Sequence, residues 1–291
     1  MFVCDLWHDY EVLDAGDGEK LERWSQVILR RPDPQVIWPK MEPSLWKMAQ
    51  ARYERSESGG GQWHFFEALP ERWIIGLHDL RFYVKPTGFK HTGLFPEQAE
   101  NWRFMRERIL EARRAGMSQP RILNLFAYTG GATLACAAAN AHVTHVDAAK
   151  SMVLWAKENR DLSGISKTRT RLIIEDVQAF VKRELRRGNR YDGIVMDPPS
   201  YGRGPGGEVW KLEDELYNLV SMSVQTLSDT PLFVVINGYT TGFSACVLRN
   251  IAQRCLCSCH SGKVEAGELA LPVTSGGLLP CGATARWLPD V

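Results

Sequence analysis

The sequence has almost no excess of charge of either sign: its 291 residues include 35 lysines and arginines against 34 aspartates and glutamates, a formal net charge of +1. The field of the whole molecule therefore cannot hold a polyanion, and a nucleic-acid partner would have to bind at a local patch. With 24% charged and 44% apolar residues, the composition excludes a disordered chain. It provides material for one large domain and a smaller one.

The sequence also lacks an apolar run of membrane-spanning length, and MFVCDLWHDY at its start has no basic segment followed by an apolar one. We therefore expect a cytoplasmic protein without a membrane partner. Seven cysteines, an odd number in a chain of this size, favour free thiols over a disulfide framework. The one local cluster, RCLCSCHSG, spaces Cys255, Cys257, Cys259 and His260 more tightly than ordinary zinc ligands, so we expect no metal site.

The character of the sequence changes near residue 90. The first part carries six of the ten tryptophans and short strand-like runs such as QWHFFEAL and RWIIGLHDLRFYVK, with a glycine-rich hairpin or loop at residues 58–62. We predict a small β-rich domain over residues 1–89 and a larger domain over residues 90–291. The larger one begins with AENWRFMRERILEARRAG, an amphipathic helix whose arginines form a solvated face.

From Arg121 the sequence alternates between strand and helix patterns. RILNLF, VTHVDA, RLIIED, YDGIVMD and PLFVVING are short β-rich runs, each followed by a helix-compatible segment. This alternation predicts an α/β fold with a mostly parallel, Rossmann-like sheet covered on both faces. GKVEAGELALP and LPCGATARW predict two more strands that give the sheet an antiparallel C-terminal edge. Ligands of such sheets bind beyond the carboxyl ends of the strands.

Polar and glycine residues stand at these strand ends. The first strand is followed by a Tyr-Thr-Gly-Gly turn into an alanine-rich helix, and the next three by Asp147, Asp176 and Asp197. Asp147 follows the turn at about the spacing of an acid that binds a ribose diol, and Asp176 is placed to accept from an adenine amino group. Because this turn lacks the G-x-G-x-x-G spacing of dinucleotide-binding domains and no P-loop is present, we expect an adenosine cofactor without phosphates, S-adenosylmethionine.

The fourth strand ends in Asp197-Pro198-Pro199-Ser200, followed by Tyr201. The two prolines fix the backbone, so that the Asp197 carboxylate and nearby carbonyls can act as rigid acceptors for a substrate nitrogen. The segment resembles the [DN]-P-P-[YFS] motif of class I methyltransferases that act on nitrogen of planar groups. Tyr201 could stack on such a group.

From about Lys90 onward the chain resembles the S-adenosylmethionine-dependent methyltransferase family that contains the bacterial 23S ribosomal RNA cytosine-5 and guanine-N7 enzymes. The resemblance rests on KHTGLFPEQ, LNLFAYTGGATLA, THVDAAKSMVLWAKEN and YDGIVMDPPSYGRG. It implies that residues 92–95 close over the cofactor and that residues 126–130 line it. It also implies an RNA substrate.

The expected site residues follow from the strand ends and from this resemblance. The cofactor-binding residues are Thr92, Gly93, Leu94, Phe95, Phe126, Ala127, Tyr128, Thr129, Gly130, Asp147, Ala148, Asp176, Val177 and Asp197. The catalytic residues are Asp197, Pro198, Pro199, Ser200 and Tyr201. GRGPGGEVW, which follows them, is expected to be a mobile substrate loop with Arg203 available for a phosphate, or an inert connection.

The sequence departs from the cytosine-5 members of the family, which place a catalytic cysteine after the fifth strand. That segment here is VINGYTTGF and contains no cysteine, while Cys136 and Cys246 lie in helices. We therefore expect direct methyl transfer to a nitrogen of a nucleobase in RNA, with ribosomal RNA as the substrate that the resemblance suggests. The alternatives are a methyltransferase of a protein or small molecule, a nucleotide-dependent oxidoreductase, and a non-catalytic binding module.

Overall fold

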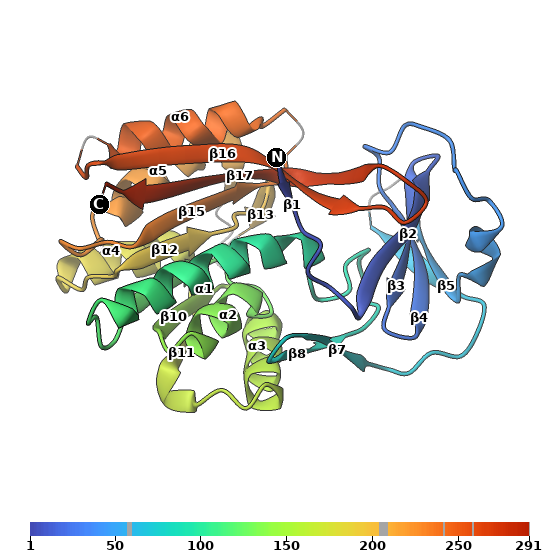
Figure 1. Cartoon of the computed structure of the whole chain (residues 1–291), viewed down its shortest axis with the longest axis horizontal. Coiled ribbons are helices and arrows are strands. Elements are labelled where there is room, and N and C mark those ends of the chain that lie inside the picture. Colours follow the sequence, from blue (N-terminus) through green and yellow to red (C-terminus); the bar gives the residue numbers. More distant parts are fainter. Residues whose placement is uncertain (57–59, 204–208, 241, 258, 291) are drawn as a thin grey trace. The chain divides into compact units, whose positions relative to one another are not determined.

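The computed structural model describes residues 1–56, 60–203, 209–240, 242–257 and 259–290 (Figure 1). The chain forms two compact units. Unit 1 comprises Met1–Phe2, Gln98–Leu269 and Gly282–Val291, and unit 2 comprises Val3–Glu97 and Ala270–Cys281. Within the described ranges, no helix is long and apolar enough to cross a membrane.

Unit 1 is built on an eight-stranded sheet with the order β1-β16-β17-β15-β12-β9-β10-β11. Its strands are β1 (Phe2–Val3), β9 (Arg121–Leu125), β10 (His142–Asp147), β11 (Thr170–Ile174), β12 (Gly193–Met196), β15 (Phe233–Gly238), β16 (Gly262–Pro272) and β17 (Leu278–Pro289). The five strands from β15 to β11 pair in parallel, whereas β17 runs antiparallel to β15. The predicted mostly parallel sheet with antiparallel C-terminal strands is thus confirmed.

Helices cover both faces of this sheet (Figure 1). They are α1 (Ala99–Arg114), α2 (Gly131–Ala138), α3 (Lys150–Leu162), α4 (Val177–Arg186), α5 (Leu212–Val224) and α6 (Ala245–Leu256), with a short 3-10 turn at Lys167–Arg169. Successive residues of β9 point to opposite faces of the sheet. Leu123 and Leu125 pack into the core cluster that includes residues of α4, α5 and α6. Asn124, between them, bonds to Thr133 of α2 on the other face.

Helix α1 confirms the amphipathic helix expected there. Trp102, Met105 and Ile109 are buried, while Arg103 pairs with Glu107 across one turn at the surface. Buried apolar area supplies most of the helix's stability, and such an exposed ion pair adds only a few tenths of a kcal/mol, roughly 0.3–0.5.

Unit 2 is rich in strands, as expected. One sheet has the order β2-β3-β4-β5-β6, and β7 pairs with β8 as a separate hairpin. The strands are β2 (Tyr10–Gly16), β3 (Glu19–Trp24), β4 (Val27–Pro32), β5 (Ala51–Arg55), β6 (Gly61–Phe65), β7 (Trp73–Leu77) and β8 (Leu80–Val84), with 3-10 turns at Leu45–Met48 and Pro96–Gln98. The expected glycine-rich hairpin is present as antiparallel pairing of β5 with β6, although its residues 57–59 lie outside the described chain.

The strand order reverses at β9. From β9 the chain proceeds through β10 to β11 on one side and then returns to place β12 on the other side of β9. In open α/β sheets, ligands bind in the crevice beyond the carboxyl ends of strands at such a reversal. The residues that follow β9 and β12 are therefore expected to line a ligand site.

Candidate functional site

The turn that follows β9 enters the left-handed region of backbone space three times. The φ angle is 54° at Phe126, 51° at Tyr128 and 92° at Gly130. Glycine adopts this conformation freely, but each of the two aromatic residues stores roughly 1–3 kcal/mol of strain. The amide of Ala127 donates to the carbonyl oxygen of Val146 at 3.1 Å, which ties the turn to the end of β10. Other contacts must hold the two strained residues.

Asp147 supplies one of these contacts. One of its carboxylate oxygens accepts the backbone N–H of Tyr128, and the other accepts that of Ala149, both at 2.8 Å. Burial raises the pKa of the Asp147 carboxyl, although the two hydrogen bonds act in the opposite direction. On the far side of the turn, the side-chain amide of Asn159 donates to the carbonyl oxygen of Thr129 at 3.0 Å. The turn is thus pinned from two sides.

The two glycines of the turn have different reasons to be glycine. A β-carbon at Gly131 would lie 2.2 Å from Cζ2 of Trp102, so a ring of α1 occupies the space a side chain would need. A β-carbon at Gly130 would lie 3.0 Å from Cβ of Ala156. The glycine pair therefore serves helix packing as well as any ligand, which the sequence did not reveal.

Asp176 has a structural role in this fold. It is exposed, and its side chain accepts the backbone N–H of Ala179 at 2.9 Å, which caps the N-terminus of α4. Val177, the first residue of that helix, is buried. The assignment of both residues to an adenine ring stays a prediction, and Asp176 has the second carboxylate oxygen with which to make such a contact.

Asp197 follows β12 directly beside the end of β9. Its backbone N–H donates to the carbonyl oxygen of Leu125 at 3.4 Å, so the catalytic motif and the turn after β9 begin at the same point of the sheet. Asp197 is half-buried and Pro198 is buried. The reversal of strand order therefore brings the expected acceptor-binding acid next to the expected cofactor turn.

The carbonyls of Pro199 and Ser200 are occupied by internal hydrogen bonds. The indole N–H of Trp210 donates to Pro199 at 2.6 Å, and the amide of Leu212 donates to Ser200 at 3.1 Å. The Ser200 hydroxyl accepts from the hydroxyl of Thr240 at 2.6 Å. These hydrogen bonds hold the motif in place, and they take up two of the carbonyls that the sequence analysis expected to accept from a substrate.

The segment after the motif is partly regular. β13 (Tyr201–Arg203) pairs antiparallel with β14 (Val209–Lys211), where the sequence suggested a loop. Residues 204–208 and the side chain of Arg203, with its expected phosphate contact, lie outside the described part of the chain. Tyr201 is 52% exposed, so its ring face is accessible for stacking.

Trp210 is a site residue that the sequence analysis missed. Its ring lies 5.2 Å from that of Phe126, centroid to centroid, at an interplanar angle of 53°. Together with the bond to Pro199, this contact joins the catalytic motif to the strained turn after β9. The available signal was an aromatic residue a few positions beyond DPPSY. The sequence of a connecting segment does not show which of its side chains packs against the candidate site.

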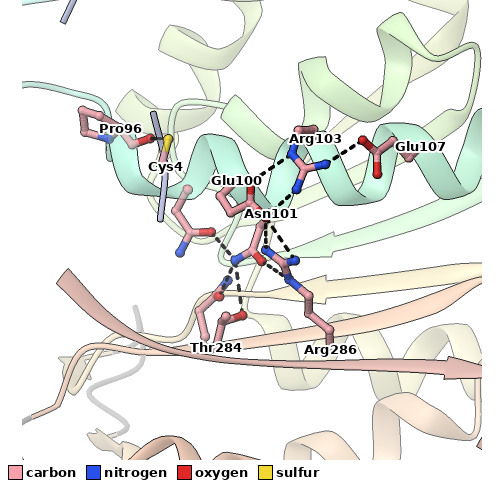
Figure 2. A network of polar contacts seen from close by, with 10 residues as sticks. Cys4, Pro96, Glu100, Asn101, Arg103, Glu107, Thr284 and Arg286 are labelled. Carbon is pink, nitrogen blue, oxygen red and sulfur yellow. Dashed lines mark hydrogen bonds and ion pairs between the residues drawn. The ribbon is translucent and has the colours of Figure 1, made fainter. Parts of the chain in front are cut away.

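A buried polar network joins α1 to β17 (Figure 2). The side chain of Asn101 in α1 donates to Asn237 at 2.9 Å and lies 3.2 Å from the hydroxyl of Thr284, and its oxygen accepts from Arg286 at 2.8 Å. Asn237 in turn donates to the carbonyl oxygen of Met196, the last residue of β12, at 3.4 Å. Asn237, the asparagine of the VINGYTTGF segment, thus has its side chain engaged in hydrogen bonds within the fold.

All seven cysteines have free thiols, as expected. Cys136 is buried in α2, where burial raises the pKa of its thiol to about 12, and Cys246 is exposed at the start of α6. In the local cluster, Cys255 is buried while Cys257 and Cys259 are exposed. Across the residues that the structure describes, no three or more potential metal ligands come together.

Thr92, Gly93, Leu94 and Phe95 belong to unit 2. The carbonyl oxygen of Thr92 accepts from the amide of Lys85 at 3.0 Å, and the ring of Phe95 lies 5.3 Å from that of His91. The Thr92 hydroxyl is buried without a hydrogen-bond partner among the described residues. A buried orphan hydroxyl suits contact with a ligand, and the assignment of this segment to the cofactor stays a prediction.

The residues of the turn fit a nucleoside cofactor without phosphates. Each oxygen of Asp147 accepts one backbone N–H and keeps acceptor capacity for a ribose hydroxyl. Ala148 and Ala149 beside it are exposed and small, which leaves room at that position. The stretch NLFAYTGGATLACAAAN contains no lysine or arginine for a pyrophosphate. These features favour S-adenosylmethionine over a dinucleotide.

Comparison with known proteins gives a consistent result. A family model described as S-adenosylmethionine-dependent methyltransferase matches residues 39–253. The crystal structure of the SAM-dependent methyltransferase from Agrobacterium tumefaciens superimposes with a TM-score of 0.93 at 35% identity, over 99% of this chain and 93% of that one.

Two curated relatives are longer than this chain. Ribosomal RNA large subunit methyltransferase K of Neisseria meningitidis serogroup B is 27% identical over 234 residues, 76% of this chain but 63% of that protein. Ribosomal RNA large subunit methyltransferase K/L of Shewanella baltica is 28% identical over 217 residues, 74% of this chain and 28% of that protein. The chain thus spans less than two thirds of either relative.

Proposed function

Because the chain belongs to the S-adenosylmethionine-dependent methyltransferase family, we propose that this enzyme transfers a methyl group to a nitrogen of a nucleobase in ribosomal RNA. The observation that carries the proposal is the hydrogen bond from the Asp197 amide to the Leu125 carbonyl, because it joins the segment proposed to bind the acceptor to the strand that leads into the turn proposed to bind the cofactor. We further propose that residues 90–291 form the methyltransferase domain, that residues 1–89 form a separate β-rich domain, and that the enzyme acts in the cytoplasm.

S-adenosylmethionine, when bound, supplies a methyl carbon already activated by a sulfonium. The task of the protein is to orient the acceptor and exclude water, since a ring nitrogen brings its own lone pair and needs no strong base. In our proposal the Asp197 carboxylate accepts a hydrogen bond from the planar group and Tyr201 stacks on its face. Asp147 holds the ribose, while Trp210 keeps both segments in register.

The chain's own thiols support nitrogen as the target over cytosine C5. Methylation of C5 needs a cysteine thiolate that first adds to the neighbouring ring carbon, C6, to make C5 nucleophilic, and the pKa of about 12 keeps the buried Cys136 protonated at neutral pH. Cys246 lies at the start of α6 and not in the segment after β15 where the cytosine-5 members carry their nucleophile. The names of the two curated relatives support ribosomal RNA as the substrate class.

The decisive experiment incubates the purified protein with methyl-labelled S-adenosylmethionine and total RNA from cells that lack the gene. Nucleoside analysis by mass spectrometry then locates the label. Label on a base nitrogen of ribosomal RNA is the expected result. Label on cytosine C5 would overturn the nitrogen assignment, and label on protein or a small molecule alone would overturn the RNA assignment.

Variants of the motif test the division of roles between cofactor and acceptor. Asp197→Ala should remove turnover while the calorimetric affinity for S-adenosylmethionine changes little, since the acid is assigned mainly to the acceptor. Cys136→Ser and Cys246→Ser should retain turnover. Loss of activity in either cysteine variant, with folding intact by circular dichroism, would contradict direct transfer.

A further inference from the structure

Unit 2 carries exposed aromatic side chains around its edge strand β6. Phe65 is 55% exposed, Phe89 is 67% exposed and Trp63 is half-buried. The rings of Trp63 and Phe65 lie 6.4 Å apart at an angle of 29°, close to parallel. The indole N–H of Trp63 lies 2.8 Å from the carbonyl of Thr87 and 3.3 Å from that of Phe89, which attaches the Phe89 segment to the strand. The rings of Phe65 and Phe89 therefore lie largely outside the core, whereas Trp63 also packs edge-on against the buried Tyr53, 5.4 Å between ring centroids.

The pairing of β5 with β6 places these rings and a cation on one face. Arg55 pairs with Gly61, Tyr53 with Trp63, and Ala51 with Phe65. Because residues two apart along a strand share a face, the Arg55 side chain projects from the same face as the rings of Trp63 and Phe65. The acid Glu54 alternates to the other face, where it pairs with His64 at 3.0 Å.

A second cation follows Phe89 in the chain. The carbonyl of Lys90 accepts from Arg31 at 2.9 Å, and Arg31 forms a bidentate ion pair with the buried Glu22 at 2.6 and 2.7 Å. Burial, followed by repulsion from Lys20 and Arg55, lowers the pKa of the Lys90 ammonium to about 8. Among the largest electrostatic contributions at Lys90, the single acid is Asp33, which also pairs with Lys20 at 3.4 Å. Positive charge therefore predominates around Lys90.

We propose that Trp63, Phe65, Phe89, Arg55 and Lys90 form a surface that binds single-stranded RNA. Bases stack on the rings and phosphates contact the two cations, the combination by which proteins hold unpaired strands. We call these five residues the stacking surface. It continues in the chain into Thr92–Phe95, the segment that the family resemblance assigns to the cofactor. The proposal rests on the proposed function, an RNA substrate. Because the net charge is only +1, RNA would have to bind at a local patch, and the stacking surface is such a patch.

Binding is tested with the full chain and a fluorescein-labelled single-stranded oligoadenylate of about 12 nucleotides, within the usual site size. Phe65→Ala combined with Phe89→Ala should weaken binding in fluorescence anisotropy at least tenfold, because each lost stacking contact is worth that order. Arg55→Gln should reduce the slope of log affinity against log salt by about 0.7, one phosphate contact. Tyr217→Ala, a ring 49% exposed on α5, and Arg186→Gln, an exposed cation of α4, are the matched controls.

Turnover separates this proposal from the proposed function. On ribosomal RNA, the double phenylalanine variant should raise KM at least tenfold, with kcat and the affinity for S-adenosylmethionine kept. If the wild type methylates RNA and the variant does so with the same KM and oligoadenylate affinity, the stacking surface is wrong while the proposed function stands. If the wild type methylates no RNA but binds the oligoadenylate through these residues, the RNA assignment of the proposed function falls and the stacking surface stands; if the wild type does not bind the oligoadenylate, the stacking surface falls.

Discussion

The ring of Trp210 rests against the ring of Phe126, 5.2 Å from centroid to centroid, while its indole N–H donates to the Pro199 carbonyl. One side chain therefore contacts both halves of the candidate site. Phe126 has a left-handed backbone, so the contact also offsets part of the strain in the cofactor turn.

Trp210→Phe tests this connection. The variant keeps the ring contact with Phe126 and loses the hydrogen bond to Pro199. The loss of one such bond costs about 1 kcal/mol, so we expect kcat to fall about fivefold and the affinity for S-adenosylmethionine to change less. Trp210→Ala should also weaken cofactor binding, because Phe126 loses its partner. Turnover and calorimetry measure the two effects. Trp38→Phe, which removes a similar bond to Ala15 at 2.9 Å within unit 2, should change neither.

Asp147→Ala should weaken binding of S-adenosylmethionine by about 10- to 150-fold, corresponding to about 1.5–3 kcal/mol for hydrogen bonds to a charged group. The loss has two sources, the ribose contact and the release of Tyr128 and Ala149. Calorimetry of the cofactor and of adenosine alone measures it. An unchanged affinity for both ligands would show that the acid serves neither the ribose nor the turn.

Asp176→Asn separates capping from cofactor binding at the start of α4. Asparagine caps helices as well as aspartate does, so the variant should keep its thermal stability. If the carboxylate also accepts from an adenine amino group, the affinity for S-adenosylmethionine should still fall about tenfold, as expected for one hydrogen bond to a charged group. Unchanged affinity would leave Asp176 with its capping role alone.

Gly131→Ala should destabilise the protein by about 1–3 kcal/mol, because the added methyl group collides with the Trp102 ring of α1. The midpoint of thermal unfolding reports the loss. Trp102→Leu in the same chain should restore part of it, since the collision is then relieved. Gly88→Ala, where a β-carbon meets no described atom within 4 Å, is the neutral control. If the losses of stability caused by Gly131→Ala and Trp102→Leu simply add in the double variant, the packing explanation is refuted.

His145 should make the protein less stable in mild acid. Burial lowers the pKa of its imidazole from the ordinary 6.5 to about 3. As the pH falls below 6.5, the unfolded chain therefore takes up a proton that the folded chain refuses, and the free energy of unfolding declines by up to about 1.4 kcal/mol per pH unit until pH 3.

His145→Asn checks this, since denaturant titrations between pH 7.5 and pH 5 should show a shallower pH dependence than the wild type. The pKa of His91, lowered to about 4 mainly by burial, gives a second contribution of the same sign. It remains in the His145 variant, and His91→Asn isolates it. A pH dependence equal to that of the wild type in both variants would contradict the assignment.

Periodicity and turn chemistry predicted the sheet and its strand ends, because both are local properties of the chain. They placed Asp147 and Asp197 at the carboxyl edge before any contact was known. The pairing of β13 with β14, the role of Trp210 and the collision of Gly131 with Trp102 depend on which distant segments meet. No local pattern encodes such contacts, and the capping bond of Asp176 competed with a ligand role that fitted the sequence equally well.

The network around Asn101 has a consequence for synthesis on the ribosome (Figure 2). Thr284 follows Asn101 by 183 residues, which corresponds to a delay of about 10–40 s at usual elongation rates. Until β17 emerges, β15 presents an open edge and the side chain of Asn101 lacks Thr284 and Arg286. During this interval β15 is paired with β12 on one side only, and its open edge is the kind that chaperones shield from intermolecular pairing. The contacts of α1 with Thr284 and Arg286 therefore form late in folding, after β17 has been synthesised.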